Sequence, residues 1–466
     1  MPAGASTGAA GGAACGDLVR ISLALDRGAT DGVIAQVGFD ASGCGAAVAA
    51  GSAAVALVTG APLLSAARVG AREISLELGG LSAAKQHAAE LAADALHRAL
   101  GAALREQAGL ARAGGRTLVA MSGGVDSAVA ALLAGERGRE AIGVTLELWS
   151  DPQNDGEASC CSAQAVRSAR ELAHGLGMAH FSVDLREEFR AGVVEHWLAG
   201  HARGQTPNPC VRCNGSVRLD AMLELADRIG AATLTTGHYA RVALDGSAPL
   251  LRTAADEAKD QSYVLAALQP ASLARLRFPL GDMHKAQVRE LARGAGLAVA
   301  GRKDSQDLCF LAGTRQRDFL QRHGGLGHRP GAILDGDGAV LGEHTGAHSF
   351  TTGQRHGLGI SGAAPLYVLG TDTLANTVTV GPRAELMSPA VSARDVTLHR
   401  EGSLVDGVRV RAHGRRHACA ISRELTAGRH EHVEIVLAEP AERTAPGQVA
   451  CLYSGELLVG VGTIAA

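Results

Sequence analysis

The chain has 466 residues, of which 46% are hydrophobic and 20% are charged, and its formal net charge is −3. It is too long for one hydrophobic core, so we expect about three domains, and no apolar run reaches the roughly 18 residues that a membrane helix needs. A nearly neutral chain does not attract nucleic acid through its overall field. Such a partner would have to be held by local basic patches.

The cysteines and the first residues bear on the compartment. Nine cysteines in so long a chain do not make the dense disulfide framework of a small secreted protein. In a reducing compartment, clustered thiols more often bind metal or take part in catalysis. Residues 1–12 are small, without a basic start or an apolar core, so we expect a flexible end and no signal peptide. We therefore expect a cytoplasmic protein with no membrane partner.

Residues 15–103 are predicted to form a separate α/β unit. The pattern predicts strands at 21–25 and 33–39 and amphipathic helices at 46–58 and 83–100. Possible metal ligands lie at three places in it, namely Cys15 with Asp17, Cys44 in a Gly-rich turn, and His87 on the last helix. Thiolate, carboxylate and imidazole together suit zinc or an iron–sulfur cluster.

This unit resembles the NifU/IscU-like iron–sulfur scaffold domain along nearly its full length, through GCGAAVAAGSA and LGGLSAAKQHAAELAADAL. The resemblance implies a scaffold-like domain at 1–108 whose metal ligands are the four residues just named. In that family a Cys directly follows the His, whereas this chain has Ala88 there. An iron–sulfur cluster site, a zinc site, and a docking domain that kept only the fold therefore all stay open.

The stretch Thr117–Leu132, TLVAMSGGVDSAVAAL, follows a linker expected at 104–115. It predicts a buried strand, a turn with two glycines and two serines, and a helix. Such a turn aims backbone N–H groups and the positive end of a helix dipole at an anion, and we expect a phosphate. The loop lacks a Gly-Lys-Ser/Thr ending, so it is not a Walker A loop, and we see no lysine placed to follow a γ-phosphate.

Residues Ser122–Ser127, SGGVDS, instead resemble the SGGxDS pyrophosphate loop of ATP pyrophosphatases. The resemblance implies that AMP is transferred to a substrate oxygen while pyrophosphate leaves. It also implies that Asp126 is the partner of Mg²⁺.

Strands and helices alternate after residue 116, which predicts an α/β fold with a doubly wound parallel sheet. The expected strands are 118–121, 141–146, 180–183 and 232–235, and the expected helices are 162–176, 188–201 and 217–229. Ligands bind at the carboxyl ends of such strands. Thr236–Tyr239 follows the last strand, so we expect it on the same edge as the Gly-rich turn.

Three cysteines are expected near that edge. Cys210 and Cys213 form a Cys-x-x-Cys in TPNPCVRCN, and Cys309 lies far downstream in KDSQDLCF. A single Cys-x-x-Cys can be a redox pair or half of a zinc site, and Cys160 or Cys161 could supply a further thiol to such a site.

Motifs along residues 116–466 occur in the order found in tRNA-specific 2-thiouridylases. They are SGGVDS, the LELW that ends at Trp149, TPNPCVRCN, TGHYAR, KDQSY, KDSQDLCF and TTGQRHGLGI. The resemblance implies that the protein replaces oxygen by sulfur at C2 of the wobble uridine in tRNA, after ATP and Mg²⁺ have been used to adenylate that oxygen. The implied partners are tRNA and a sulfur donor, either a cysteine desulfurase or a sulfur relay protein.

The same resemblance assigns site residues by position. It implies that ATP is bound by Ala120, Met121, Ser122, Gly123, Gly124, Val125, Asp126, Ser127, Leu146 and Gly237. It implies that tRNA is contacted by Asn208, Pro209, Cys210, His238, Lys259, Asp260, Gln261, Arg411 and Gln448. Cys213 matches the family's nucleophile, and Cys309 matches the cysteine that carries the persulfide and then pairs with Cys213 in a disulfide.

Cys210 departs from the family, since many members have Asp at this position. Cys210, Cys213 and Cys309 together offer three thiolates, which can hold a [4Fe–4S] cluster with one iron open for the sulfide to be transferred. The other route needs no metal: a thiolate of low pKa takes up a persulfide that attacks the adenylated carbon, and a second cysteine resolves it. Both routes stay open.

The last part of the chain is rich in short strands with Asp-Gly and Gly-rich turns. We expect a small linking domain at 327–385 and a β-barrel at 386–466, after a catalytic domain at 112–326. Positive charge in the barrel comes from His413, Arg415, Arg416 and His417.

Lysine occurs only at positions 85, 259, 285 and 303, and three of these four fall in one stretch, as expected if arginine cannot replace them there.

Two functions other than thiouridylation stay open. One is another ATP pyrophosphatase, such as an amidating synthetase, although no glutaminase segment is visible. The other is an iron–sulfur or sulfur carrier in which ATP is only a regulatory switch.

Overall fold

The computed structural model describes residues 4–11, 16–26, 30–151, 162–246, 248–302, 308–311, 313–360, 364–421 and 424–466. Contacts divide the chain into two compact units. The first consists of Met1–Glu187, Asp220–His238 and Ala274–Ala312, and the second of Glu188–Leu219, Tyr239–Leu273 and Gly313–Ala466. Both units take segments from the stretch expected to be one catalytic domain.

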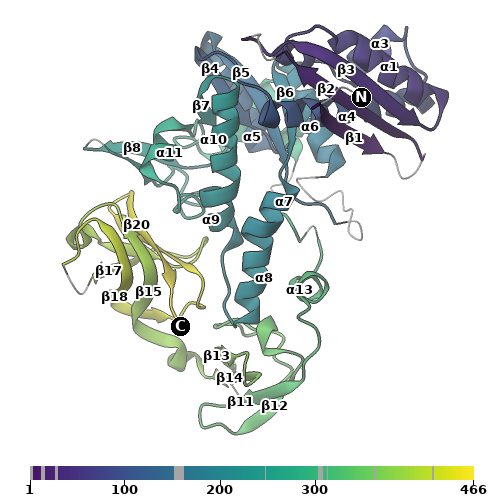
Figure 1. The fold of residues 1–466 in the computed structure, drawn as a ribbon. Coiled ribbons are helices and arrows are strands. Elements are labelled where there is room, and N and C mark those ends of the chain that lie inside the picture. Colours follow the sequence, from purple (N-terminus) through teal and green to yellow (C-terminus); the bar gives the residue numbers. More distant parts are fainter. Residues whose placement is uncertain are drawn as a thin grey trace. The chain divides into compact units, whose positions relative to one another are not determined.

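The first unit begins with a small antiparallel sheet covered by helices (Figure 1). Its strands, in the order β1-β2-β3, are β1 (Ser6–Gly11), β2 (Leu18–Leu25) and β3 (Ile34–Ser42). Its helices are α1 (Gly45–Val58), α2 (Leu63–Ala66), α3 (Ala71–Glu77), η1 (Ala83–Lys85) and α4 (Gln86–Glu106). Alternate residues of β2 and the alanine-rich face of α4 are fully buried, so these two elements build the core of this part.

Strand β1 corrects the expectation of a flexible end, because all of it pairs with β2. A side chain at Gly8 would place its Cβ 2.3 Å from the backbone of Ala95 and Ala99, so only glycine allows this strand to lie against α4. The expected linker is also shorter than 104–115, because α4 continues to Glu106 with Leu104 buried inside.

The rest of the first unit is a five-stranded parallel sheet in the order β10-β7-β4-β5-β6. The strands are β4 (Ala113–Ala120), β5 (Glu140–Glu147), β6 (Ala179–Asp184), β7 (Ala231–Thr235) and β10 (Leu276–Arg277). The accompanying helices are α5 (Val125–Gly135), η2 (Glu136–Gly138), α6 (Ala163–Gly175), α10 (Leu219–Arg228), α12 (Lys285–Gly294) and η5 (Ala298–Gly301). The predicted doubly wound parallel sheet is confirmed. Only the two-residue strand β10 at its edge was not expected.

The second unit contains a helical segment and two β-structures. The helical elements are α7 (Arg186–Phe189), η3 (Arg190–Val194), α8 (Glu195–Ala202), α9 (Pro209–Cys213), η4 (Asn214–Arg218), α11 (Pro270–Arg275) and α13 (Gln316–Gly324), of which α7 and α11 cross the boundary between units. A four-stranded sheet of order β12-β11-β14-β13 follows. Its elements are β11 (Gly331–Leu334), β12 (Val340–His344), η6 (Ala347–Ser349), β13 (Tyr367–Asp372) and β14 (Thr377–Gly381).

The chain ends in the expected β-barrel (Figure 1). Its elements are η7 (Arg383–Leu386), β15 (Met387–Leu398), η8 (Gly402–Leu404), β16 (Gly407–Arg409), β17 (His417–Ile421), β18 (Gly428–Glu442), β19 (Val449–Ser454) and β20 (Leu457–Ile464). In the described residues, β15 pairs with both β18 and β20 and so closes six strands around an apolar core. The hairpin of β8 (Arg241–Asp245) and β9 (Ala248–Arg252) extends the sheet beyond β20. None of the described helices has the length and apolar character to cross a bilayer.

Candidate functional site

Residues 122–127, which form the end of the turn after β4 and the first three residues of α5, are called the pyrophosphate loop below. Gly123 has a φ of +71°, a left-handed conformation that glycine adopts without strain. The Ser127 hydroxyl donates to the Gly124 carbonyl at 3.0 Å and accepts from the Ser122 amide at 3.2 Å. Helix α5 starts at Val125. The loop thus has a fixed shape, with the start of an eleven-residue helix at an anion-binding position.

Gly237 lies directly against this loop. A Cβ atom at position 237 would come within 2.7 Å of the Asp126 carbonyl carbon and of the Ser127 amide nitrogen. Both are backbone atoms, so no side-chain rotation could relieve the clash. The carboxyl end of β7 therefore meets the carboxyl end of β4, as expected from the parallel sheet.

Leu146 lies on the neighbouring strand β5 and is buried. Here the Thr145 hydroxyl donates to the Met121 carbonyl at 3.0 Å, and the Met121 amide donates to the Val144 carbonyl at 2.8 Å. The end of β5 is thereby joined to the start of the loop. The expected nucleotide residues from β4, β5 and β7 lie at one edge of one sheet.

Lys285 is a site residue that sequence reasoning missed. Its Nζ lies 2.7 and 2.8 Å from the two carboxylate oxygens of Asp126. A second cation, Arg302, donates to the Gly123 carbonyl at 3.0 Å. The expectation that no lysine is placed to follow a γ-phosphate was drawn from the loop itself, whereas Lys285 lies 159 residues away from Asp126 in the chain. In the sequence, only the scarcity of lysine pointed to Lys285.

Cys210 and Cys213 lie three residues apart on the short helix α9, and so on the same face. The Asn208 side chain caps this helix by accepting from the amides of Cys210 and Val211 at 3.0 and 3.2 Å. Burial raises the pKa of the Cys210 thiol, while the charge of Arg218 acts in the opposite direction. A thiol in such a place remains protonated until a base removes its proton or a bound metal displaces it.

The expected sulfur residues belong to different units, since Cys210 and Cys213 are in the second and Cys309 in the first. Cys213 is buried and Cys309 is half-buried. Four residues of the sequence analysis, Cys15, Cys160, Cys161 and Lys303, lie outside the described residues.

Some residues expected at tRNA hold the protein's own fold. Asp260 is buried and accepts hydrogen bonds of 2.7 Å from both Arg409 and the Ser262 hydroxyl. The Gln261 side chain accepts from the Tyr239 amide at 2.9 Å, and that of Gln448 donates to the Thr206 carbonyl at 2.5 Å.

Other residues of this set are more accessible. Lys259 and His238 are half-buried, and the His238 ring lies 2.8 Å from the Thr236 hydroxyl. Arg411 is exposed and lines a cavity of about 450 Å³ in the second unit. The cationic side chains around this cavity are those of Arg383, Arg411, Arg415 and, when protonated, His417. This is the kind of local basic patch that a nearly neutral chain needs to hold a polyanion.

Beside the N-terminal sheet, the ligand atoms of Asp17, which precedes β2, Cys44 at the start of α1, and His87 on α4 lie within 4.8 Å of one another. One carboxylate oxygen of Asp17 is 3.3 Å from the Cys44 Sγ and 3.3 Å from the His87 Nε2. Carboxylate, thiolate and imidazole at this spacing fit a single zinc or iron ion. Ala88, which takes the place of the scaffold family's next cysteine, is fully buried.

Four family models match consecutive parts of the chain. They are the NifU-like N terminal domain at 2–108, the tRNA methyl transferase HUP domain at 115–313, the tRNA methyl transferase PRC-barrel domain at 317–382, and the aminomethyltransferase beta-barrel domain at 395–464. A bifunctional protein NifU/MnmA of Rubrobacter xylanophilus is 44% identical over 471 residues, which cover 98% of this chain and 93% of that protein.

The chain belongs to the NifU/MnmA family. Proteins named tRNA-specific 2-thiouridylase MnmA match a shorter part of it. The one from Thermobifida fusca is 45% identical and covers 75% of this chain, and the one from Geobacter metallireducens is 41% identical over the same share. These alignments cover 95% and 96% of the two relatives.

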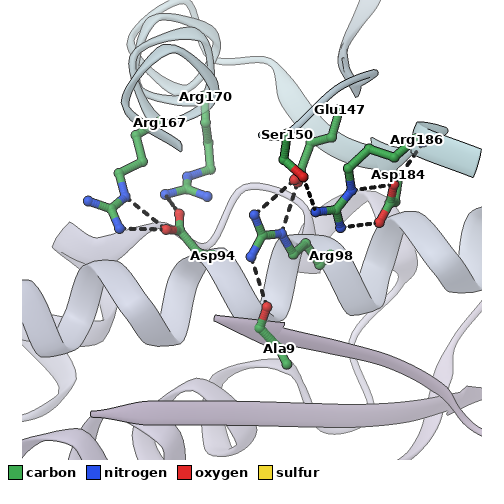
Figure 2. A network of polar contacts seen from close by, with 9 residues as sticks. All are labelled: Ala9, Asp94, Arg98, Glu147, Ser150, Arg167, Arg170, Asp184 and Arg186. Carbon is green, nitrogen blue, oxygen red and sulfur yellow. Dashed lines mark hydrogen bonds and ion pairs between the residues drawn. The ribbon is translucent and has the colours of Figure 1, made fainter. Parts of the chain in front are cut away.

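In this NifU/MnmA chain, ion pairs join the scaffold-like part to the parallel sheet (Figure 2). Asp94 on α4 accepts from Arg167 and Arg170 on α6, each at 2.8 Å. Arg98, also on α4, donates to both oxygens of Glu147 at the end of β5 and to the Ala9 carbonyl of β1. These carboxylates are nearly fully buried, so the pairs fix the orientation of α4 on the sheet.

A histidine cluster lies beside these pairs. His97 on α4 lies 2.9 Å from the carbonyls of Val69 and His180, and its ring is 5.5 and 6.0 Å from the rings of His174 and His180. Burial, and next the charge of Arg170, hold the pKa values of His97 and His180 well below the usual range. The two parts of this NifU/MnmA unit thus meet through a buried, neutral histidine cluster as well as through ion pairs.

Proposed function

We propose that this chain is an ATP-dependent sulfurtransferase that converts the wobble uridine of tRNA to 2-thiouridine. Membership in the NifU/MnmA family carries this proposal, because its relatives include proteins named tRNA-specific 2-thiouridylase. The geometry supports it through the pyrophosphate loop and the paired thiols of α9. We expect the reaction to take place in the cytoplasm, with tRNA as the substrate.

The first step converts the C2 oxygen of uridine, which is a poor leaving group, into a good one. The C2 oxygen of uridine attacks the α-phosphorus of ATP, the bond to the β-phosphate oxygen breaks, and pyrophosphate leaves with the electron pair. The loop amides and the start of α5 bind the phosphates. The Asp126 carboxylate is of a type that Mg²⁺ prefers, and such an ion would neutralise phosphate charge.

The second step brings in sulfur. In the persulfide route, the terminal sulfur on one cysteine bonds to C2, and AMP leaves with the electrons of the C–O bond. A second thiolate then attacks the cysteine sulfur, which forms a disulfide and frees 2-thiouridine. An external thiol must reduce that disulfide before the next cycle. Cys213 and Cys309 take these parts in our proposal, and the persulfide sulfur comes from a cysteine desulfurase or a sulfur relay protein.

In the cluster route, Cys210, Cys213 and Cys309 would hold a [4Fe–4S] cluster. Burial raises the pKa of the Cys210 thiol, so this residue would lose its proton only when a metal or a base displaces it. The variant Cys210→Ser separates the routes after anaerobic purification. Loss of both iron and thiolation supports the cluster, whereas full thiolation without iron supports the persulfide.

Basic side chains in the second unit are a further means of binding the tRNA substrate. We propose that a phosphate of the tRNA backbone enters the cavity lined by Arg411 and Arg415. Such contacts do not depend on the base sequence. Arg411→Gln should therefore weaken the binding of all substrate tRNAs by a similar factor and reduce the salt dependence of that binding.

Pyrophosphate release with and without unmodified tRNA tests the function. The proposal predicts release that depends on tRNA and a product that has exchanged oxygen for sulfur. Release without any dependence on tRNA would favour a carrier protein with an ATP switch. If a methylated nucleoside were formed instead, the result would favour a tRNA methyltransferase, which is the activity in the name of the HUP-domain family model.

A further inference from the structure

Helix α9, which carries both thiols of the Cys-x-x-Cys, is tied at its two ends to two consecutive residues. The Asn208 side chain, which caps the helix, hydrogen-bonds with the Tyr263 hydroxyl. At the other end, the Asn214 side chain donates to the Val264 carbonyl at 3.2 Å. A helix of five residues is too short to keep its conformation by itself in water, so these ties determine where the thiols lie.

The Tyr263 side chain is fully buried, and its hydroxyl has a fixed direction. It donates to the Val449 carbonyl of β19 at 3.0 Å, so its oxygen is left to accept from Asn208. The amide oxygen of Asn208 already accepts from two backbone amides of α9, which leaves its NH₂ group as the donor. Burial raises the pKa of the Tyr263 hydroxyl, so this group keeps its proton and remains a donor. A line of hydrogen bonds thus runs from β19 through Tyr263 and Asn208 to the cysteine helix.

The residues just before α9 are held by the same end of the barrel. The Thr206 amide donates to the Pro446 carbonyl at 2.7 Å, and the Thr206 carbonyl accepts from the Gln448 side chain at 2.5 Å. Pro446 and Gln448 belong to the turn between β18 and β19. The segment that leads into α9 is therefore fixed on the barrel, and the cap of the helix is fixed there through Tyr263.

The same tyrosine lies beside the basic cavity of the second unit. Its hydroxyl is 3.5 Å from the carbonyl oxygen of Val410, and Val410 and Arg411 both line the cavity. One hydroxyl thus lies between the chain segment of the proposed phosphate contact and the cap of the helix with the thiols. This matters for a group transfer, because a displacement of about 1 Å between reacting atoms can slow the reaction about a hundredfold.

We propose that Tyr263 is a positioning residue of the sulfur-transfer step. Its hydroxyl holds the cap of α9 on β19, and so sets the distance between the thiols and a tRNA that is bound on the barrel. The inference rests on the proposed function for its substrate, and it adds a residue that controls where sulfur is presented. It applies to the persulfide route and to the cluster route, because both use Cys213 of α9.

The test uses variants of the full-length protein that remove one hydrogen bond at a time. Tyr263→Phe deletes the hydroxyl and keeps the packing of the ring. Tyr453→Phe is the matched control, because Tyr453 is also fully buried and lies on β19, and its hydroxyl is 3.1 Å from the Ser262 hydroxyl. Asn208→Ser is a second route to the same break, since serine still caps a helix but is too short to reach the tyrosine.

Three quantities are measured for each variant. The first is the rate at which iodoacetamide alkylates Cys210 and Cys213 in the reduced, free protein, relative to Cys419 on β17, by peptide mass spectrometry. The second is kcat and KM for the formation of 2-thiouridine in unmodified tRNA. The third is the number of pyrophosphate molecules released for each 2-thiouridine formed. Thermal unfolding reports the structural cost.

We expect Tyr263→Phe to lower kcat about tenfold or more, with KM for tRNA changed less than about threefold. Alkylation of the α9 thiols should become about threefold to tenfold faster, because the helix opens more often. More pyrophosphate should be released for each product, because the adenylated base is hydrolysed before sulfur reaches it. Asn208→Ser should increase alkylation similarly, and combining it with Tyr263→Phe should add little. Tyr453→Phe should lower the unfolding temperature by a similar amount and change none of the three quantities.

Three results would overturn the proposal. They are an unchanged kcat in Tyr263→Phe, a lower kcat without faster alkylation of the α9 thiols, and equal effects of Tyr263→Phe and Tyr453→Phe. Alkylation needs neither tRNA nor ATP. If the unmodified chain forms no 2-thiouridine, the proposed function fails, and the alkylation rates still decide whether Tyr263 positions the cysteine helix.

Discussion

Arg98 on α4 donates hydrogen bonds of 2.9 and 2.8 Å to the two carboxylate oxygens of Glu147, the last residue of β5. This pair joins the scaffold-like part of the chain to the strand that carries Leu146 at the carboxyl edge of the sheet. The scaffold-like part is therefore fixed on the sheet rather than held by a flexible tether.

Breaking this pair should destabilise the first unit. Arg98→Met leaves the buried Glu147 carboxylate without its main cation, and we expect a loss of about 3 kcal/mol in the free energy of unfolding. Denaturant unfolding checks this value. The double variant Arg98→Met with Glu147→Leu should recover much of it, because no charge then stays buried alone. Equal stability of Arg98→Met and the unmodified chain would show that the pair does not hold the two parts together.

The histidine cluster predicts acid sensitivity. Burial lowers the pKa values of His97, His174 and His180 below 6.5 in the folded chain. As the pH falls through 6.5, the unfolded chain takes up protons that the folded chain does not, so stability falls with pH. Unfolding free energies at pH 7.5 and 5.5 measure the effect, and His180→Gln should reduce it. An unchanged pH dependence in that variant would remove His180 from the explanation.

Gly237→Ala should weaken ATP binding while the fold persists. The added Cβ would lie 2.7 Å from loop backbone, so the loop must shift away from β7. We expect affinity for an ATP analogue to fall by about tenfold or more, measured by calorimetry. Gly175→Ala is the matched control, because a Cβ there meets nothing within 4 Å and alanine suits the end of α6. Similar loss in both variants would contradict the close approach as the cause.

The N-terminal ligands predict a metal that depends on Cys44. Iron, zinc and sulfide analysis after anaerobic purification should find metal in the unmodified chain and less of it in Cys44→Ser, because the thiolate of the Asp17–Cys44–His87 group is then missing. Ala88→Cys restores the ligand of the scaffold family and should raise iron and sulfide content. If Cys44→Ser keeps all its metal, the ion is bound elsewhere.

Local patterns were sufficient to predict much of this protein. The run from Leu118 to Met121 and the Gly-rich turn after it predicted the strand, the loop and the helix start, since each depends on neighbours in sequence, but β4 begins at Ala113, inside the expected linker. The parallel sheet and the barrel followed from the order of such segments. The three N-terminal ligands in the described residues also came together as expected.

Features set by distant contacts could not be predicted. Strand β1 has no apolar alternation, and Gly8 is explained only by α4 lying against it. Lys285 meets Asp126, and Arg98 meets Glu147, across long stretches of chain that have no pattern in common. Asp260 was expected at the tRNA, and only the structure shows that Arg409 and Ser262 enclose its carboxylate.

The most direct test of the central claim is the amount of 2-thiouridine formed in unmodified tRNA by the full-length protein. The reaction contains ATP, Mg²⁺, cysteine and a cysteine desulfurase, and nucleosides are quantified by mass spectrometry. Cys213→Ser and Cys309→Ser are compared with Cys419→Ser, whose thiol is half-buried on barrel strand β17. The account predicts product from the unmodified chain and Cys419→Ser and none from the other two. Full product from both Cys213→Ser and Cys309→Ser would contradict it.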